Sequence, residues 1–144
     1  MSYKQFLTQQ VLQSISIPAT AALADIYRFI GFDGKYAEAN KSALGVLQYA
    51  AADKEMASVA TAGIVVVEAA AAIAVGKAVV SNAVGKALAA TDLSVTIPED
   101  TTPVTSDAAQ PTLVVAGSAA PQVILGYALD EATADGDIIR IKLA

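Results

Sequence analysis

Four acidic side chains near the C-terminus, Asp130, Glu131, Asp135 and Asp137, are the strongest candidates for chemistry in this sequence. Clustered carboxylates supply the oxygen ligands that hard cations take, and two of them could act as general acid and base. The spacing lacks the closing glutamate of an EF-hand loop, and no nucleophile accompanies the acids. Asp135 followed by Gly136 is typical of a tight turn, since glycine accepts positive φ and aspartate accepts hydrogen bonds from nearby amides. We therefore expect a turn here, in preference to a cation site or an acid–base pair.

The dipeptide Gly85-Lys86 resembles the end of a phosphate-binding loop. That motif, G-x-x-x-x-G-K-[ST], requires glycine where this chain has Val80 and a hydroxyl residue where it has Ala87. Gly76-Lys77 fails in the same way. Both pairs are interpreted as glycine turns with solvated lysines.

Glu68 lies within an apolar run, where an unpaired carboxylate would be costly to bury. We expect it at a strand end or edge, with Lys77 or Lys86 as its partner.

Composition excludes several classes of function. The chain has no Cys and no His, which removes disulfides, thiolate and Ser-His catalysis, and zinc sites that need sulfur or imidazole. Its net charge of −5 is the wrong sign for binding a phosphate backbone, so no nucleic-acid partner is expected. We expect no cofactor and no metal.

The elements that position these groups read mainly as strands. The period-two segment 13–18 predicts a strand that ends at Pro18, and 25–30 and 44–49 are further candidates. The charged residues 52–55 predict a turn. Residues 57–61 and 64–68 read as two strands separated by Ala62-Gly63, because β-branched residues favour extended backbone.

The alanine-rich segment 69–90 has the propensity of a helix, but Gly76 and Gly85 interrupt it. We favour short strands joined by glycine turns over a helix, and the deciding argument is the family resemblance given at the end of this section. Residues 123–129 and 138–143 predict two closing strands around a turn at 134–137.

Two segments fall outside this strand pattern. Residues 92–112, rich in proline, threonine and acids, predict a long surface loop. Residues 1–10 are interpreted as a mobile or partner-ordered N-terminal arm, in which Tyr3, Phe6 and Leu7 would contact the partner or a neighbouring protomer. The remaining residues, 11–144, are expected to form one domain: a compact, small β-barrel or sandwich-like domain of the mainly β class.

A faint internal repetition accompanies these elements. Leu44-Gly45-Val46 matches Leu125-Gly126-Tyr127, and 52–55 matches 134–137 one residue out of step. Each match precedes a β-patterned segment, so the sequence indicates two similar strand-turn-strand units.

Short motifs also follow one another in a definite order from residue 44 to the C-terminus. They are Leu44-Gly45-Val46-Leu47, Ala52-Asp53-Lys54-Glu55, the stretch 59–67, Ala74-Val75-Gly76-Lys77-Ala78-Val79, Gly85-Lys86-Ala87, the stretch 125–132, Gly136-Asp137 and Arg140-Ile141-Lys142-Leu143. In this order they resemble the capsid cement, or head decoration, proteins of tailed double-stranded DNA bacteriophages.

This resemblance implies a small β-rich, barrel-like domain. It implies a homotrimer on the outer capsid surface of the virion, bound to the major capsid protein and made in the host cytoplasm. It also implies a mechanical activity, the stabilisation of the head against internal DNA pressure, with no enzyme and no cofactor. The alternative is a small holin-like membrane protein that uses the apolar segment 57–80, although Glu68 and Lys77 interrupt that segment.

Overall fold

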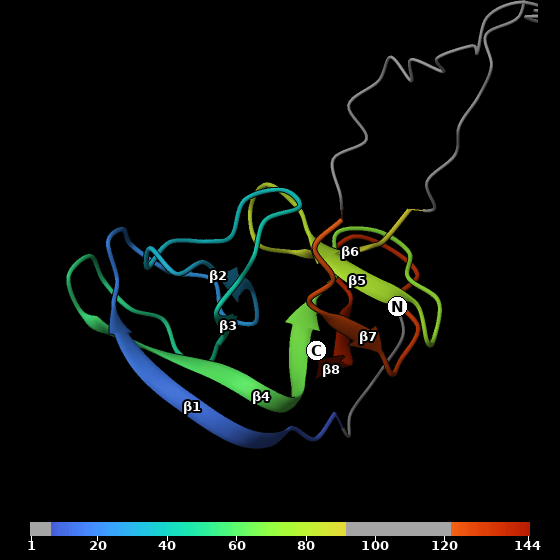
Figure 1. Ribbon diagram of the computed structural model, residues 1–144, viewed down its shortest axis with the longest axis horizontal. Helices are drawn as coiled ribbons and strands as arrows, with labels where there is room; N and C mark the ends of the chain where they lie inside the picture. The colour runs from blue at the N-terminus through green and yellow to red at the C-terminus, as the bar shows by residue number, and fades with distance from the viewer. Residues whose placement is uncertain (1–6, 92–121) are drawn as a thin grey trace, which may run out of the picture. The chain divides into compact units, whose positions relative to one another are not determined.

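The computed structural model describes residues 7–91 and 122–144 (Figure 1). Tyr3, Phe6 and the predicted loop at 92–112 lie outside these residues. All regular elements in the described part of the chain are strands: β1 (Gln10–Pro18), β2 (Phe29–Ile30), β3 (Gly45–Leu47), β4 (Met56–Glu68), β5 (Ala78–Ser81), β6 (Ala87–Ala89), β7 (Gly126–Ala128) and β8 (Ile138–Leu143).

The strands form one antiparallel sheet in the order β2-β3-β4-β8-β7-β5-β6, with β1 added along β4. The two ends of this order approach each other, because the Phe29 N–H donates to the Gly85 carbonyl over 2.7 Å and Ala69 bridges to Ala87. The sheet is therefore a nearly closed barrel, which confirms the predicted mainly β, barrel-like fold.

β4 corrects one prediction. Residues 57–61 and 64–68 are not two strands but parts of one strand of 13 residues that continues through Gly63. Gly63 has φ 108°, and a Cβ there would lie 2.2 Å from the Gln10 carbonyl oxygen of β1. Glycine thus permits both the bend and the close approach, so that β4 changes direction without ending.

The alanine-rich segment folds as predicted, since β5 and β6 replace the helix that propensity alone favours. The strands expected at 25–30, 44–49 and 123–129 are shorter than predicted. In the first of them Tyr27 has φ 61°, which interrupts extended backbone before β2.

The faint sequence repetition corresponds to a repeat of the whole hydrogen-bonding pattern. We define a first half, residues 10–62, and a second half, residues 64–91 with 122–143. In the first, Ala19 N–H donates to the Glu55 carbonyl; in the second, Ala69 N–H donates to that of Asp137. The same equivalence holds for seven further pairs of backbone hydrogen bonds, listed here by donor and acceptor: Lys54–Ala19 and Gly136–Ala69, Leu23–Ala51 and Ile73–Ala132, Ala51–Leu23 and Ala132–Ile73, Leu47–Arg28 and Ala128–Lys77, Gln48–Ser58 and Leu129–Arg140, Leu44–Ile30 and Leu125–Val79, Gly31–Lys35 and Asn82–Lys86.

β4 belongs to both halves. Its N-terminal part pairs with β1, with Ile17 opposite Ala57, and its C-terminal part pairs with β8, with Val67 opposite Ile139. The N-terminal part of β4 is therefore equivalent to β8, and the C-terminal part is equivalent to β1. In Figure 1 the green β4 runs beside the blue β1 before it turns toward the red β8.

Each half has its own apolar cluster. In the first, Leu23, Leu47 and Val59 are fully buried in one cluster, and in the second Ile73, Val67 and Ile141 are buried in the other. Phe29 and Val46 of the first half also enter the second cluster, which joins the halves through a common core.

Candidate interaction surface

The structure describes one of the three arm residues predicted to contact a partner. Leu7 is half-buried, whereas Tyr3 and Phe6 lie outside the described residues. Gln10 is already part of β1. The Gln9 side chain donates to Gln48 Oε1 over 3.0 Å and accepts a hydrogen bond from the Val66 N–H over 3.1 Å. The side-chain amide of Gln9 is therefore held by Gln48 through its nitrogen and by β4 through its oxygen.

The C-terminal acids serve separate interactions. Asp130 forms an ion pair with Arg140 over 2.9 Å. The side-chain hydrogen bond to Asp130 raises the pKa of the Arg140 guanidinium. Asp137 accepts hydrogen bonds from the backbone and hydroxyl of Thr133, and Gly136 has φ 91°. The predicted turn is confirmed, and among the described residues no three His, Cys, Asp or Glu side chains gather closely enough to hold a metal ion.

Glu68 ends β4 and lies at the centre of a charge network. It pairs with Lys86, one of the two lysines predicted as its partner, over 3.2 Å. It also pairs with Arg28 over 3.1 Å, which the sequence did not indicate. Lys86 also pairs with Asp135 over 2.8 Å, and the Arg28 guanidinium lies 5.5 Å from the ring centre of Tyr36. Since Arg28 belongs to the first half and Lys86 to the second, the network fastens the two halves together.

The ionisation of this network follows from its contacts. The hydrogen bond to Asp135, followed by that to Glu68, raises the pKa of Lys86. The same bond lowers the pKa of Asp135. Burial raises the pKa of Tyr36. The shifts of Lys86 and Asp135 keep that ion pair charged near neutral pH, and the shift of Tyr36 keeps its hydroxyl neutral.

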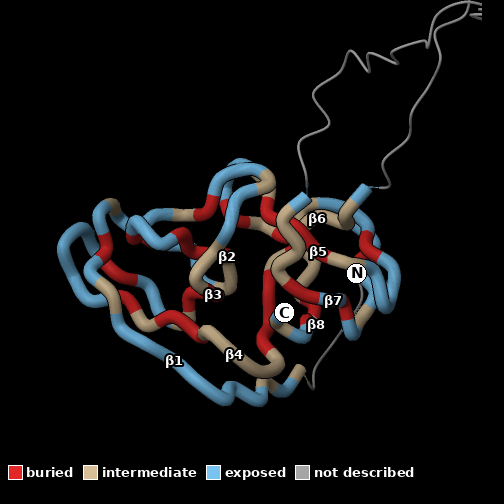
Figure 2. Tube along the Cα trace, in the orientation of Figure 1, coloured by how far each residue is buried: buried red, intermediate tan, exposed pale blue. Residues whose placement is uncertain are grey.

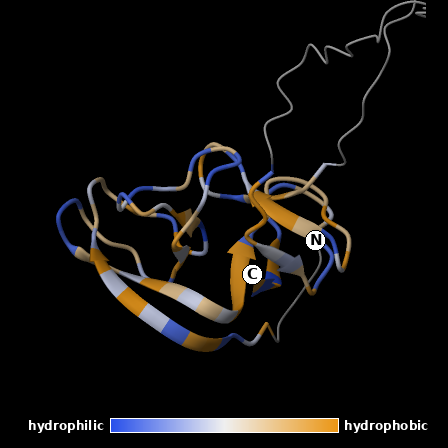
Figure 3. Cartoon of the chain, viewed as in Figure 1, coloured by the Kyte–Doolittle hydropathy of each residue, from blue (hydrophilic) through white to orange (hydrophobic). Residues whose placement is uncertain are grey.

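The largest exposed element is β1. Figure 2 shows it pale blue along most of its length, and only Ile17 is even half-buried. Apolar side chains alternate with polar ones along it in Figure 3, and Leu12 is 75% exposed. The sequence from Gln5 to Ala24 carries no charged residue at all, a signal that sequence reasoning missed. β1 is thus an uncharged, partly apolar strand at the surface.

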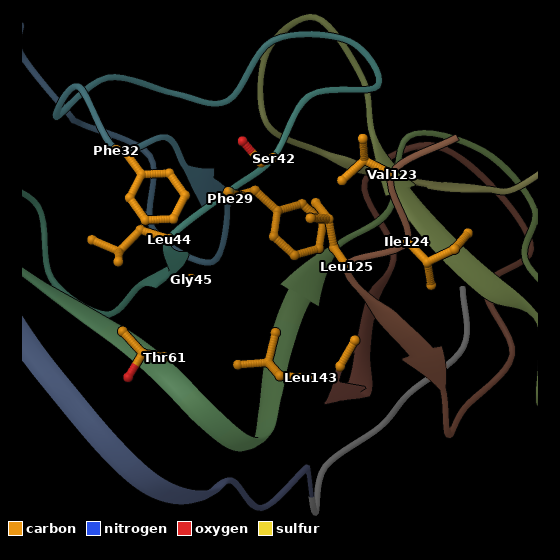
Figure 4. Close-up of a pocket in the computed structure, with 12 residues that line it drawn as sticks. Phe29, Phe32, Ser42, Leu44, Gly45, Thr61, Val123, Ile124, Leu125 and Leu143 are labelled. Atoms are coloured by element: carbon orange, nitrogen blue, oxygen red, sulfur yellow. The ribbon is translucent and has the colours of Figure 1, made fainter. Parts of the chain in front are cut away.

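A second surface feature is an apolar hollow of about 220 Å³ where the two halves meet. Leu44 and Gly45 line it from the first half, and Leu125 and Leu143 line it from the second, with Phe29 between them (Figure 4). Its volume is below the roughly 300 Å³ at which small-molecule sites begin. The hollow suits a single apolar side chain of a partner better than a substrate.

The apolar segment 57–80 forms β4 and the start of β5, joined by turns. Within residues 7–91 and 122–144, no helix has the length and apolarity needed to cross a membrane. The segment on which the holin-like alternative depends is thus folded as strands and turns, not as a helix.

Comparison with known proteins gives two findings. A family model described as phage cement protein matches residues 9–143. A solved structure described as the head fiber gp8.5 N base in bacteriophage phi29 superimposes with a TM-score of 0.61 at 16% identity, covering 92% of this chain and 93% of that one. No curated protein sequence matches the chain.

The structural match establishes a common fold, and the family match covers nearly the whole chain. That match includes both halves and the β1 strand, together with the ordered motifs from residue 44 that first suggested the resemblance. The chain therefore belongs to the phage cement protein family, and it is a capsid decoration protein.

Proposed function

We propose that the protein binds the outer surface of the phage head through the major capsid protein, as a homotrimer, after synthesis in the cytoplasm of the bacterial host. There it holds neighbouring capsid subunits together against internal DNA pressure. It acts by binding and not by catalysis.

The observation that carries this proposal is the family match over residues 9–143. Two features of the described chain support it: β1 offers an uncharged strand, and the hollow offers an apolar socket. A trimer bound at several points would be retained strongly even where single contacts are weak, because each later contact forms at high effective concentration.

The test is addition of the purified protein to expanded, undecorated capsids of its own phage. We expect co-sedimentation with the capsids, three copies per binding site, and greater resistance of the particles to heating and osmotic shock. Binding to the inner face only, seen by electron microscopy, or binding without any gain in resistance would contradict the proposal.

The N-terminal arm is part of the same proposal, with Tyr3, Phe6 and Leu7 as capsid or protomer contacts. Deletion of residues 1–6 leaves Gln9 and its two hydrogen bonds in place. We expect the shortened protein to keep its thermal unfolding temperature and to bind capsids more weakly. Capsid affinity equal to that of the full chain would show that Tyr3 and Phe6 are not contacts.

A further inference from the structure

The two equivalent strands β1 and the C-terminal part of β4 differ in what covers their outer edges. In β4 the Val66 N–H donates to Gln9 Oε1 and the Glu68 N–H donates to the Tyr27 carbonyl over 2.8 Å. These two outward donors of the strand are therefore satisfied by other parts of the chain.

The backbone geometry of β1 shows which of its groups point outward. Ala19 N–H donates to the Glu55 carbonyl, and antiparallel strands alternate inward and outward groups along the chain. Ile17 and Ile15 therefore direct their N–H groups toward β4, and Ser16 and Ser14 direct theirs away from it. Among the described residues, no group accepts a hydrogen bond from the outward N–H of Ser14 or Ser16.

This open edge also lacks the usual protection against pairing. Natural edge strands are blunted by charged residues, by proline or by covering loops. No charged residue occurs between Gln5 and Ala24, and Pro18 marks only the end of the strand. Ile15 is 38% exposed, whereas its equivalent Val65 in β4 is fully buried. The edge is built to receive another strand.

Pro18 argues against a second copy of this chain as that strand. It is equivalent to Glu68, whose N–H donates to the Tyr27 carbonyl within the molecule. If a second copy docked onto β1 in the way that the first half docks onto β4, its Tyr27 carbonyl would face Pro18, which has no N–H to donate. In addition, a strand edge about 30 Å long covers roughly 300 Å², well below the ~800 Å² per partner of a stable free dimer. The edge therefore suits a partner to which the protein is also attached elsewhere, and of the two such partners in the proposed assembly, Pro18 disfavours another protomer.

We propose that an extended, uncharged segment of the major capsid protein adds as a strand to the outer edge of β1 and pairs with the backbone of Ser14 and Ser16. This inference rests on the proposed function and names the contact that it uses. Backbone pairing holds the added strand, and Val11, Leu12 and Ile15 provide the apolar contacts beside it.

The test uses the full chain with Ser14→Pro and Ser16→Pro together, which removes the two outward donors and leaves the inward bonds of Ile15 and Ile17 to β4 intact. The control is Ser14→Ala with Ser16→Ala, which removes both hydroxyls but keeps both N–H groups. We expect the proline variant to bind undecorated capsids at least about tenfold more weakly, with the alanine control unchanged. Wild-type affinity in a folded proline variant would overturn the inference, and failure of the wild type itself to bind would instead overturn the proposed function.

A second measurement holds even if the proline variant does not fold. The chain has no cysteine, so Ser16→Cys introduces a single thiol on the open edge for a photoactivated crosslinker. We expect a crosslinked product with the major capsid protein on decorated particles. A product with a second copy of this chain, or none with the capsid protein in particles that carry the variant, would overturn the inference.

Discussion

The two halves repeat one hydrogen-bonding scheme but differ in how their first strands are used. In the second half that strand is the C-terminal part of β4, where Val65 and Val67 are buried and the outer edge is satisfied. In the first half it is β1, where every residue except Ile17 is exposed. The same scheme thus gives a buried strand where another half precedes it and an open strand where the described chain has no half before it.

This difference separates stability from recognition. The second half contributes most of the larger apolar cluster and three members of the charge network, Glu68, Lys86 and Asp135. Changes to β1 should therefore affect binding more than folding, and changes to the core of the repeat should do the reverse. The following predictions test how far the equivalence of the halves extends.

Gly45 and Gly126 occupy equivalent positions, and alanine at either should cause the largest loss of stability. A Cβ at Gly45 would lie 1.9 Å from the Ala60 carbonyl oxygen, and one at Gly126 would lie 2.5 Å from that of Lys142. We expect each substitution to destabilise the fold by about 3 kcal/mol or more, with Gly45→Ala the worse of the two. Thermal unfolding by circular dichroism measures this.

The control for that comparison is Gly76→Ala. Gly76 has φ 81° but nothing within 4 Å of the added Cβ, so only backbone strain of about 1 kcal/mol applies. Similar losses at Gly76 and Gly45 would show that the close approach of the strands is not what requires glycine.

Glu68→Gln should have an intermediate effect, because it leaves Arg28 and Lys86 near each other without the carboxylate that joins them. The Glu68 side chain is only 20% exposed, so we expect a loss of about 1–3 kcal/mol. The matched control is Asp130→Asn, because Asp130 is about as buried as Glu68 but its partner Arg140 lies in the same half and is more exposed than Arg28 or Lys86. A larger loss at Asp130 would contradict the view that Glu68 joins the halves.

The smallest expected effect is a pH dependence that belongs to Asp135. Its pKa is lowered in the folded protein, so its contribution is present above the ordinary carboxyl pKa of about 3.9 and is lost as the pH falls through the folded value. Lys86 has a raised pKa, so its contribution is lost only as the pH rises beyond about 10.4. Asp135→Asn should flatten the decline in unfolding temperature below about pH 4. If the unfolding temperature of the variant declined below about pH 4 as steeply as that of the wild type, other carboxylates would be responsible for the decline.

Local patterns in the sequence predicted the local elements well. Period two identified the strand before Pro18, and Asp-Gly identified the turn at Asp135. The strands within 69–90 were predicted chiefly from the family resemblance, with two glycines in support, against the helix propensity of alanine. The continuity of β4 was missed because Gly63 reads as a separator, whereas its role is to let β1 approach.

The interactions between distant segments were not visible in the sequence. Arg28 lies 40 residues from Glu68, and nothing in either neighbourhood indicates the pairing. The apolar hollow arises only when Leu44 and Leu125 are brought to the same place by the repeat. The open edge of β1 had one sequence signal, the absence of charge from Gln5 to Ala24. Its meaning depends on knowing that β4 is the only strand of the described residues that pairs with β1.

When consecutive repeats share a strand, the number of repeats fixes the number of long strands. Two repeats joined in this way need three long strands, not four, and any longer series would need one more strand than it has repeats. The middle strand has neighbours on both sides, while the first strand has no half before it in the described part of the chain. An open edge at the start of the described series thus follows from the sharing of a strand, and a virus particle that needs an attachment point can use it without adding any new element to the fold.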